Sequence, residues 1–528
     1  MVAVLQLAAF LALLLVALWR LAWQPRAVAR AFARQGIRGP SYTFLAGSLL
    51  EAKRLVMDGR RGAALDAGCH DIMPVLLPPF SRWVADYGKT FLFWVGPIPA
   101  VFSTDLQLIK QVLTDRTGLY QKDFMIPVMK FLFGGNGVIL LNGDDWKRHR
   151  RVVLPAFNHD KIKRMSMLTA EVTDQMRQQW SEQIHQSGDE QSAKVDMTHA
   201  MRDLTTEITG RIAFGTSHQE GDEVFGLMRE MQKLATAAMM DAPILWYLPT
   251  PRNLHVRRLN KQLRSKIISI MQARLAAKRA TTNKCGGGNE NDLLGLLLQA
   301  WTPQQHGIGN GGERLTTDEV IDECKTFFAA GQDATATLLV WAMFLLAVHP
   351  QWQDKVREEV LREFGTHHDG GEVPNADVLA KLMLLHMVLL ETLRLYPPVV
   401  YIQRTAASDV VLGGINVPKG TIISIPIAML HRDREVWGPD ADEFNPMRFE
   451  HGVTKAASDP KALLAFSLGP RVCTGQSFAI VEAQVVMAMI LSKFTISLSP
   501  KYVHKPRYLL TLAPKLGMPL ILRNIVAE

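Results

Sequence analysis

Apolar residues follow helical spacing along much of the chain, and strand-like patterns are confined to short stretches. Between residues 160 and 280 the apolar positions recur with helical periodicity and leave charged faces. Thr90–Phe102 has instead the β-branched and aromatic content of a hairpin. Tyr508–Leu522 contains strand-like runs that could form another hairpin. These patterns predict amphipathic helices joined to small amounts of β structure.

One apolar stretch is much longer than its neighbours. Thr316–Glu319 is typical of a capping box, and the apolar residues after it continue to His349 and Pro350, where proline ends the helix. A helix of over thirty residues rises about 1.5 Å per residue and can cross a whole domain. Asp333 lies inside it, shortly after a small Ala-Gly pair that lets a flat group approach the backbone. A carboxylate in so apolar a helix is costly unless it is hydrated or paired.

The chain begins with an apolar segment. Val2–Trp19 contains one polar residue and is just long enough to span a bilayer, which takes about 20 residues. Arginines follow it, so the positive-inside rule places that flank in the cytosol. A cleaved signal peptide is disfavoured because no Lys or Arg precedes the run and no clear cleavage site follows it. We predict a signal-anchor transmembrane helix at 1–23, a basic linker at 24–41 and a folded body at 42–528.

Composition narrows the class of protein. The 528 residues are 48% hydrophobic and contain no long Pro- or Ser-rich linker, so we expect one large domain. Glycine-rich stretches at 284–291 and 302–313 are predicted surface linkers. Four scattered cysteines without a CxxC motif argue against a disulfide scaffold. The net charge of +9 suits an acidic partner or anionic lipid, but no basic motif of a nucleic-acid-binding protein is present.

Phe466–Gln476 reads FSLGPRVCTGQ and carries the strongest candidate chemistry. Gly469 and Gly475 flank Cys473, so the backbone can fold tightly around the sulfur and aim amide N–H groups at it. Arg471 adds positive charge, and a helix starting after Gly475 presents the positive end of its dipole. These features favour a thiolate, although a lone cysteine is more often a buried free thiol.

The spacing F-x-x-G-x-R-x-C-x-G resembles the haem-binding loop of the cytochrome P-450 family. Four other motifs of that family precede it in the expected order: W-x-x-x-R at Trp146 and Arg150, A-G-x-D-x-T at 330–335, E-x-x-R at Glu391 and Arg394, and F-x-P-x-R-F at 444–449. The amino-acid sequence is most similar to plant microsomal members of the hormone and fatty-acid hydroxylase clan. The resemblance implies a mainly α fold with small β-sheets, and it makes residues 42–528 a haem-thiolate catalytic domain.

The resemblance also assigns roles to residues. Cys473 is expected to be the axial thiolate ligand of the iron of haem b, and Arg471 to pair with a haem propionate. The other residues expected at the cofactor are Trp146, Arg150, Arg404 and Phe466. A buried scaffold network is expected from Glu391, Arg394 and Arg448. Substrate contacts are expected from Val399 and Val400.

The motif in the long helix departs from the family pattern at one position. By resemblance Asp333 is the acid of a relay that delivers protons to activated oxygen, and Thr335 is the motif's second threonine; both are expected to be catalytic. The residue directly after the acid is usually Thr, and here it is Ala334. Thr335 lies about 100° further round the helix. Water or a substrate hydroxyl is therefore a candidate for the missing group.

The implied reaction inserts one atom of O2 into a C–H bond of an apolar small molecule, such as a fatty acid, steroid, terpenoid or hormone. Electrons are expected from NADPH through a membrane-bound NADPH-cytochrome reductase, which would dock on a basic face at Lys147, Arg148 and Arg151. The expected location is the endoplasmic reticulum membrane, single-pass, with the catalytic domain in the cytosol. Two alternatives remain open: a haem-thiolate isomerase or lyase that uses no O2, which Ala334 supports, and a non-catalytic haem sensor or carrier.

Overall fold

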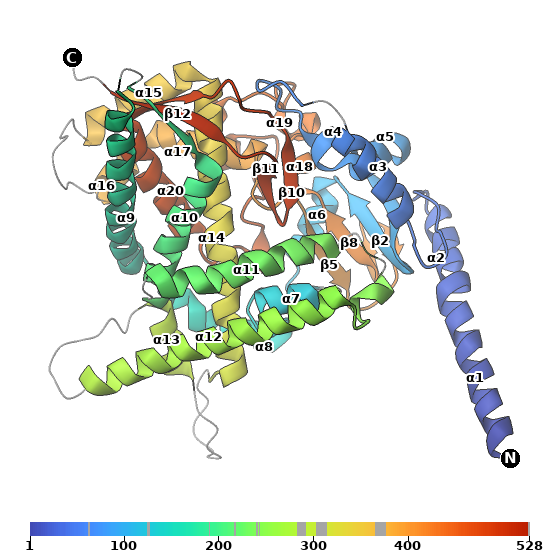
Figure 1. The fold of residues 1–528 in the computed structure, drawn as a ribbon. Helices are drawn as coiled ribbons and strands as arrows, with labels where there is room; N and C mark the ends of the chain where they lie inside the picture. Colours follow the sequence, from blue (N-terminus) through green and yellow to red (C-terminus); the bar gives the residue numbers. More distant parts are fainter. Residues whose placement is uncertain are drawn as a thin grey trace.

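A helix of 32 residues, α14 (Thr317–Val348), runs through the middle of the protein (Figure 1). Thr316 caps it as predicted: the Thr316 hydroxyl accepts the Glu319 N–H, and the Glu319 carboxylate accepts the Thr316 N–H. Most α14 side chains are buried, and those of its C-terminal half join the main core with α17 (Met383–Leu395) and α20 (Gln476–Leu491). This helix therefore organises the packing of the helical body.

The computed structural model describes the chain except residues 62–63, 124–126, 189–190, 216–217, 239–240, 242, 282–291, 302–313, 365–375 and 526–528. Both predicted glycine-rich linkers lie outside the described residues. The helices not yet named are α1 (Val2–Leu18), α2 (Gln24–Ala33), α3 (Leu49–Arg61), α4 (Met73–Leu76), α5 (Pro78–Tyr87), α6 (Leu106–Leu113), α7 (Pro127–Phe133), α8 (Gly143–Val153), α9 (His159–Gln186), α10 (Met197–Thr209), α11 (His218–Ala238), α12 (Pro251–Thr281), α13 (Leu293–Ala300), α15 (Pro350–Phe364), α16 (Ala376–Lys381), α18 (Ile427–Leu430) and α19 (Arg434–Trp437).

The strands form small sheets, so the fold is mainly α with minor β structure, as expected. One sheet has the order β1 (Thr90–Val95), β2 (Ile98–Ser103), β8 (Ile422–Ile425), β5 (Ile402–Ala406) and β3 (Tyr120–Gln121). A second has the order β4 (Ala193–Asp196), β12 (Pro519–Asn524) and β9 (Phe494–Leu498). Two-stranded hairpins are formed by β6 (Val410–Leu412) with β7 (Ile415–Val417), and by β10 (Pro506–Leu509) with β11 (Thr511–Pro514). The hairpin predicted at Thr90–Phe102 is thus confirmed as β1–β2.

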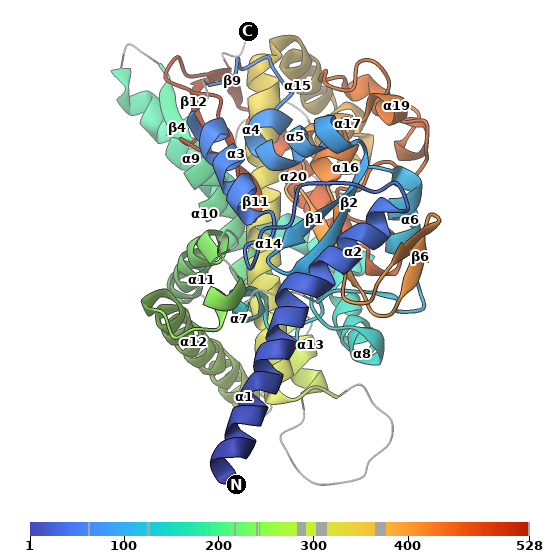
Figure 2. The ribbon, with the colours of Figure 1, turned by 90° about the vertical axis from the view of Figure 1, so that its right-hand side faces the viewer.

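The N-terminal helix projects from the body (Figures 1 and 2). α1 continues without a break through a π-helical turn into α2, and the stretch Val4–Arg34 is apolar enough to cross a membrane, with a mean hydropathy of 2.2 and none of its most apolar window buried. Residues 24–33 are helical where the sequence suggested a linker, and Phe32 is fully buried in a core cluster of the body. The candidate membrane helix is thereby joined to the folded domain by packing.

The apolar stretch at residues 127–141 packs closely against α14. It contains α7, and the glycine-rich turn after α7 lies directly on α14. A side chain at Gly137 would collide with the Thr326 hydroxyl, and one at Gly134, which has φ +78°, would collide with the Asp322 backbone. These glycines are required by the close approach of two backbones.

A buried ion network ties α17 to the segment before the cysteine loop. The two carboxylate oxygens of Glu391 accept Nε–H and Nη2–H of Arg394, both at 2.7 Å, and Arg448 Nε lies 3.7 Å from Glu391 Oε1. Arg394 also donates to the carbonyls of His431 and Ala441. Both partners of the central pair are fully buried. The predicted scaffold network is confirmed, and each charge in it has a partner.

Replacing Arg394 with Met is expected to destabilise the fold strongly, because it leaves the Glu391 carboxylate buried and uncompensated. We expect a loss of about 3–5 kcal/mol in the free energy of unfolding, measured by urea denaturation. The matched control is Arg82→Ala, which breaks the exposed Arg82–Asp86 pair and should change stability by less than about 1 kcal/mol. Equal effects of the two substitutions would contradict a structural role for the network.

Candidate functional site

Cys473 lies in a tight loop just before α20. Gly469, with φ +72°, lets the loop pass so close to the Leu113 carbonyl that a side chain there would collide with it. The Cys473 N–H donates to the Phe466 carbonyl at 3.0 Å, and Arg150 Nη1 donates to the Val472 carbonyl at 3.0 Å. Both bonds fix the peptide unit between Val472 and Cys473, and so they position the residue that carries the sulfur.

The Cys473 side chain is surrounded by protein atoms and is nevertheless solvent-accessible. These two observations agree if the sulfur faces an internal space. Burial raises the pKa of the thiol, while the Gly475 N–H, Lys122 and Arg150 act to lower it. A positive group above the sulfur would favour the thiolate further.

Trp146 and two arginines form a stack beside the loop. The Arg471 guanidinium lies 4.1 Å and the Arg150 guanidinium 5.6 Å from the Trp146 ring centroid. Such cation–π contacts hold planar cations in place without neutralising them. Arg471 Nη2 also donates to Asn142 Oδ1 at 3.2 Å, while its Nη1 is buried without a partner among the described residues. A polar group that cannot reach water is thus left available for a ligand.

Two further cations complete this group. Arg404, on β5, is buried, and burial lowers its pKa to about 10. Burial, reinforced by Arg404 and Arg150, lowers the pKa of Arg471 to about 10. Lys122 has a pKa well below its usual range because burial and the three arginines disfavour its charge. None of the four cations forms an ion pair within the described part of the chain. Their arrangement suits a dianionic ligand.

Sequence reasoning missed Lys122. The pairing Gln121↔Thr405 between β3 and β5 brings Lys122 opposite Arg404, and strands so far apart in sequence cannot be paired from the sequence alone. The only sequence feature that could have pointed to Lys122 was its position as a single cation at the start of a long apolar stretch.

One face of α14 opens toward an accessible space. Ala330 is exposed, and Phe327 and Ala334 are partly exposed, in a helix whose other faces are buried. These positions are three and four residues apart, so they share a face. Phe157 stacks on Phe327 at 6.0 Å and reaches Gly475, where an added Cβ would lie 3.7 Å from its ring. The small face of α14 and the cysteine loop therefore lie on either side of Phe157.

Asp333 and Thr335 point in different directions. Asp333 Oδ2 accepts the Gln232 Nε2–H at 2.7 Å, and Arg202 Nε lies 3.7 Å from Oδ1. Burial raises the pKa of Asp333, and Arg202 and Gln232 oppose that shift. Thr335 is buried against Glu482 of α20, whose carboxyl pKa is raised to about 8 by burial. The hydroxyl of Thr335 thus belongs to the contact between two helices, and position 334 supplies no hydroxyl.

The two residues expected to contact the substrate differ in their exposure. Val399 is partly exposed, whereas Val400 is fully buried in the main core. Val400 is therefore a packing residue in this structure.

The profile of the family described as Cytochrome P450 matches residues 80–520, which include every element of this site. The chain belongs to the cytochrome P450 family. Its members are monooxygenases that hold haem through a cysteine thiolate, and this P450 is accordingly a monooxygenase enzyme.

Plant P450s are among the proteins similar to this chain. Cytochrome P450 709B3 of Arabidopsis thaliana is 38% identical over 514 residues, which cover 96% of this chain and 95% of the relative. Secologanin synthase 2 of Catharanthus roseus is 37% identical over 530 residues, covering 98% and 97%. Among solved structures, retinoic acid bound cyanobacterial CYP120A1 superimposes with a TM-score of 0.70 at 21% identity, covering 84% of this chain and 94% of that one. That likeness establishes the P450 fold.

A polar seam fixes α8, and with it Trp146 and Arg150, against α14. His149 is fully buried; its Nδ1 lies 2.6 Å from Glu323 Oε1, and its Nε2 lies 3.4 Å from Glu319 Oε1. Glu323 Oε1 also accepts the Val138 N–H at 2.8 Å. Since His149 directly precedes Arg150, this contact sets how the stacked cations face the cysteine loop.

Replacing His149 with Ala is expected to cost about 3 kcal/mol in the free energy of unfolding, because Glu323 loses its buried partner. Adding Glu323→Gln should restore part of that loss, since a neutral amide does not need the imidazole. Urea denaturation measures both effects. The control is His451→Ala on the exposed surface, which should change stability by less than about 0.5 kcal/mol. Additive losses in the double variant would mean that the two side chains do not act as a pair.

Proposed function

We propose that Cys473 is the axial thiolate ligand of haem in this P450. Three observations support the assignment: the accessible sulfur in a tight loop, the four cations beside it, and the small exposed face of α14. The cations suit the two haem propionates, and the small face suits a flat ring. The unpartnered Nη1 of Arg471 is the kind of donor that a carboxylate satisfies.

The residues around the site have distinct parts in this proposal. Haem held by a thiolate supplies the activation of O2. The propionates are held by four cations, Arg150, Arg404, Arg471 and Lys122. The Trp146 ring positions the guanidinium groups of Arg150 and Arg471 through cation–π contacts. Phe466 accepts the Cys473 N–H through its carbonyl and so fixes the loop. Asp333 holds and releases protons on the α14 side, with Thr335 buried behind it.

We further propose that the protein is a membrane-anchored enzyme of the endoplasmic reticulum that hydroxylates an apolar small molecule. The exposed apolar helix α1 supports the anchor, and the exposed Ala330 with the partly exposed Phe327 and Val399 supports an apolar substrate. Fatty acids, steroids, terpenoids and hormones all meet this description. NADPH, through a membrane-bound flavin reductase, is the proposed source of electrons.

Substituting Cys473 with Ser is expected to abolish the absorption near 450 nm (a value that the family resemblance supplies) of the reduced, CO-treated protein and to abolish NADPH-dependent product formation. The reason is that a hydroxyl is a far poorer donor to iron than a thiolate. Cys69→Ser, at an exposed free cysteine, is the matched control and should leave the spectrum unchanged. Retention of the thiolate spectrum in the Cys473 variant would refute the assignment.

The reductase is proposed to dock beside α8, where Lys147 and Arg151 are exposed. Arg148, which the sequence also placed on this face, is instead bonded to Glu319 at 2.5 Å, to Asp145 and to the Arg314 carbonyl. Its charge is used to hold α8 on α14. The docking face is therefore narrower than expected, and its exposed cations are Lys147 and Arg151.

Lys147→Glu with Arg151→Glu is expected to raise the apparent KM for reductase roughly tenfold at low ionic strength, because attraction to an acidic partner is replaced by repulsion. The difference should shrink as salt is added. Arg257→Glu with Arg258→Glu, on the exposed side of α12, makes the same change of charge elsewhere and is the control. An unchanged KM, or an equal change in the control, would remove the docking proposal.

A haem-thiolate isomerase or lyase remains the second candidate, because Ala334 lacks the hydroxyl of the usual motif. Substrate-dependent NADPH consumption in the presence of reductase separates the two. Compounds that shift the haem Soret band identify ligands for this assay, and product analysis then shows whether oxygen has been inserted. Turnover that continues without NADPH and O2 would favour the isomerase.

A further inference from the structure

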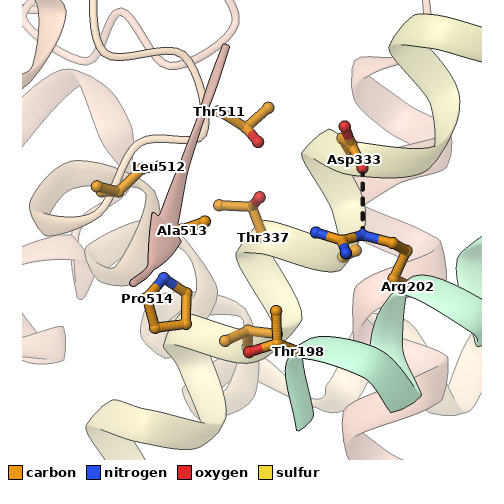
Figure 3. A pocket seen from close by; sticks show the side chains of 10 residues that line it. Thr198, Arg202, Asp333, Thr337, Thr511, Leu512, Ala513 and Pro514 are labelled. Atoms are coloured by element: carbon orange, nitrogen blue, oxygen red, sulfur yellow. Dashed lines mark ion pairs between the residues drawn. The ribbon is translucent and has the colours of Figure 1, made fainter. Parts of the chain in front are cut away.

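A small cavity lies beside α14, between α10 and β11 (Figure 3). Its volume is about 20 Å³, which is room for about one water molecule. Its polar lining comes from Asp333 and Thr337 of α14, Thr198 and Arg202 of α10, and Thr511 at the start of β11. Figure 3 shows Thr337 below Thr511, with the Asp333–Arg202 pair to the right of both. The cavity is thus polar on several sides, as a bound water requires.

Among the residues that the structure describes, Asp333 Oδ1 has no direct hydrogen-bond donor. Gln232 donates to Oδ2 at 2.7 Å, but Arg202 Nε is 3.7 Å from Oδ1, which is too long for a direct hydrogen bond. At this separation, a water beside the pair could hydrogen-bond to both groups. The Thr198 hydroxyl is also buried and has no hydrogen-bond partner in the described part of the protein.

Thr337 supplies a hydroxyl on the Asp333 side of the helix. It follows Asp333 by four residues, so the two side chains lie on the same face one turn apart. Ala334 has no hydroxyl, and that of Thr335 lies against Glu482. In this chain Thr337 is therefore the α14 hydroxyl that shares a cavity with the acid.

We propose that this cavity binds one water that joins the Asp333 carboxylate to Arg202 and to the hydroxyls of Thr337 and Thr511, and that protons reach Asp333 through it. The Arg202 side chain is 31% exposed, so the path begins at solvent. A proton enters the water as another passes to Asp333, which releases its own toward the space beside Ala334 and returns to the carboxylate. No group is oxidised or reduced. The water site stands on geometry, whereas its catalytic role rests on the monooxygenase function proposed above.

The water site is tested first in the resting holoenzyme, without turnover. Thr337→Val keeps the shape of the side chain and removes one partner of the water, so the midpoint of thermal unfolding should fall by about 2 °C. Thr511→Val should also lower it, and the double variant should lose less than the sum, because both hydroxyls bind the same water. A dry cavity predicts the opposite: Val would leave stability unchanged or raise it, and that result would overturn the site.

The proton path is tested by coupling, the fraction of NADPH electrons recovered in product rather than in hydrogen peroxide. With a compound selected by its Soret shift, Thr337→Val should lower coupling at least threefold and change the solvent deuterium isotope effect, and Thr337→Ser, which keeps a hydroxyl, should restore both. Normal coupling in the Val variant would overturn the path while leaving the monooxygenase intact. A wild-type enzyme that consumes no NADPH would instead refute the proposed function itself.

Discussion

Four cations gather around one thiol, and no carboxylate is paired to them in the described part of the chain. Arg404 is buried and the other three are partly buried, so together they impose the main electrostatic constraint on this protein. Each loses hydration on burial, and each repels the others, which is why the pKa values of Arg404 and Arg471 fall to about 10. A dianion bound at this place relieves the repulsion. Because such a ligand binds the native state and not the unfolded chain, it stabilises the fold by mass action.

The cations come from four separate parts of the chain, and each part is fastened by contacts outside the cluster. α8 is held to α14 through His149 and Glu323, and β3 is held to β5 by strand pairing. The segment before the cysteine loop is tied to α17 by the network of Glu391. The carboxylates of Glu323 and Glu391 thus anchor the elements and do not pair with the four cations in the described part of the chain. This separation of charge leaves the site positive without leaving its supports unpaired.

Much of this arrangement follows from local sequence. The capping box at Thr316, the β1–β2 hairpin, and the pairing of Glu391 with Arg394 depend on residues close in the chain, so their patterns predict them. Lys122 could not be found, because its place depends on the pairing of β3 with the distant β5. The burial of Val400 and the neutralisation of Arg148 by Glu319 likewise depend on tertiary packing, which spacing alone does not encode.

Ala334 stands where the family motif usually has threonine, so the hydroxyl groups of α14 must come from other positions on the helix. Three threonines, at 326, 335 and 337, lie within three turns of one another, but packing gives each hydroxyl a different neighbour. The Thr326 hydroxyl donates to the Phe133 carbonyl at 2.5 Å, and the Thr335 hydroxyl lies against the buried Glu482. Only Thr337 lines the cavity with Asp333. Ala334 therefore removes a hydroxyl from the face toward the accessible space, while the acid keeps a polar neighbour on the face toward α10. Under the proposed function, an apolar face toward the accessible space, with polar groups placed to one side, would favour apolar substrates and would make proton supply depend on water rather than on a hydroxyl at position 334.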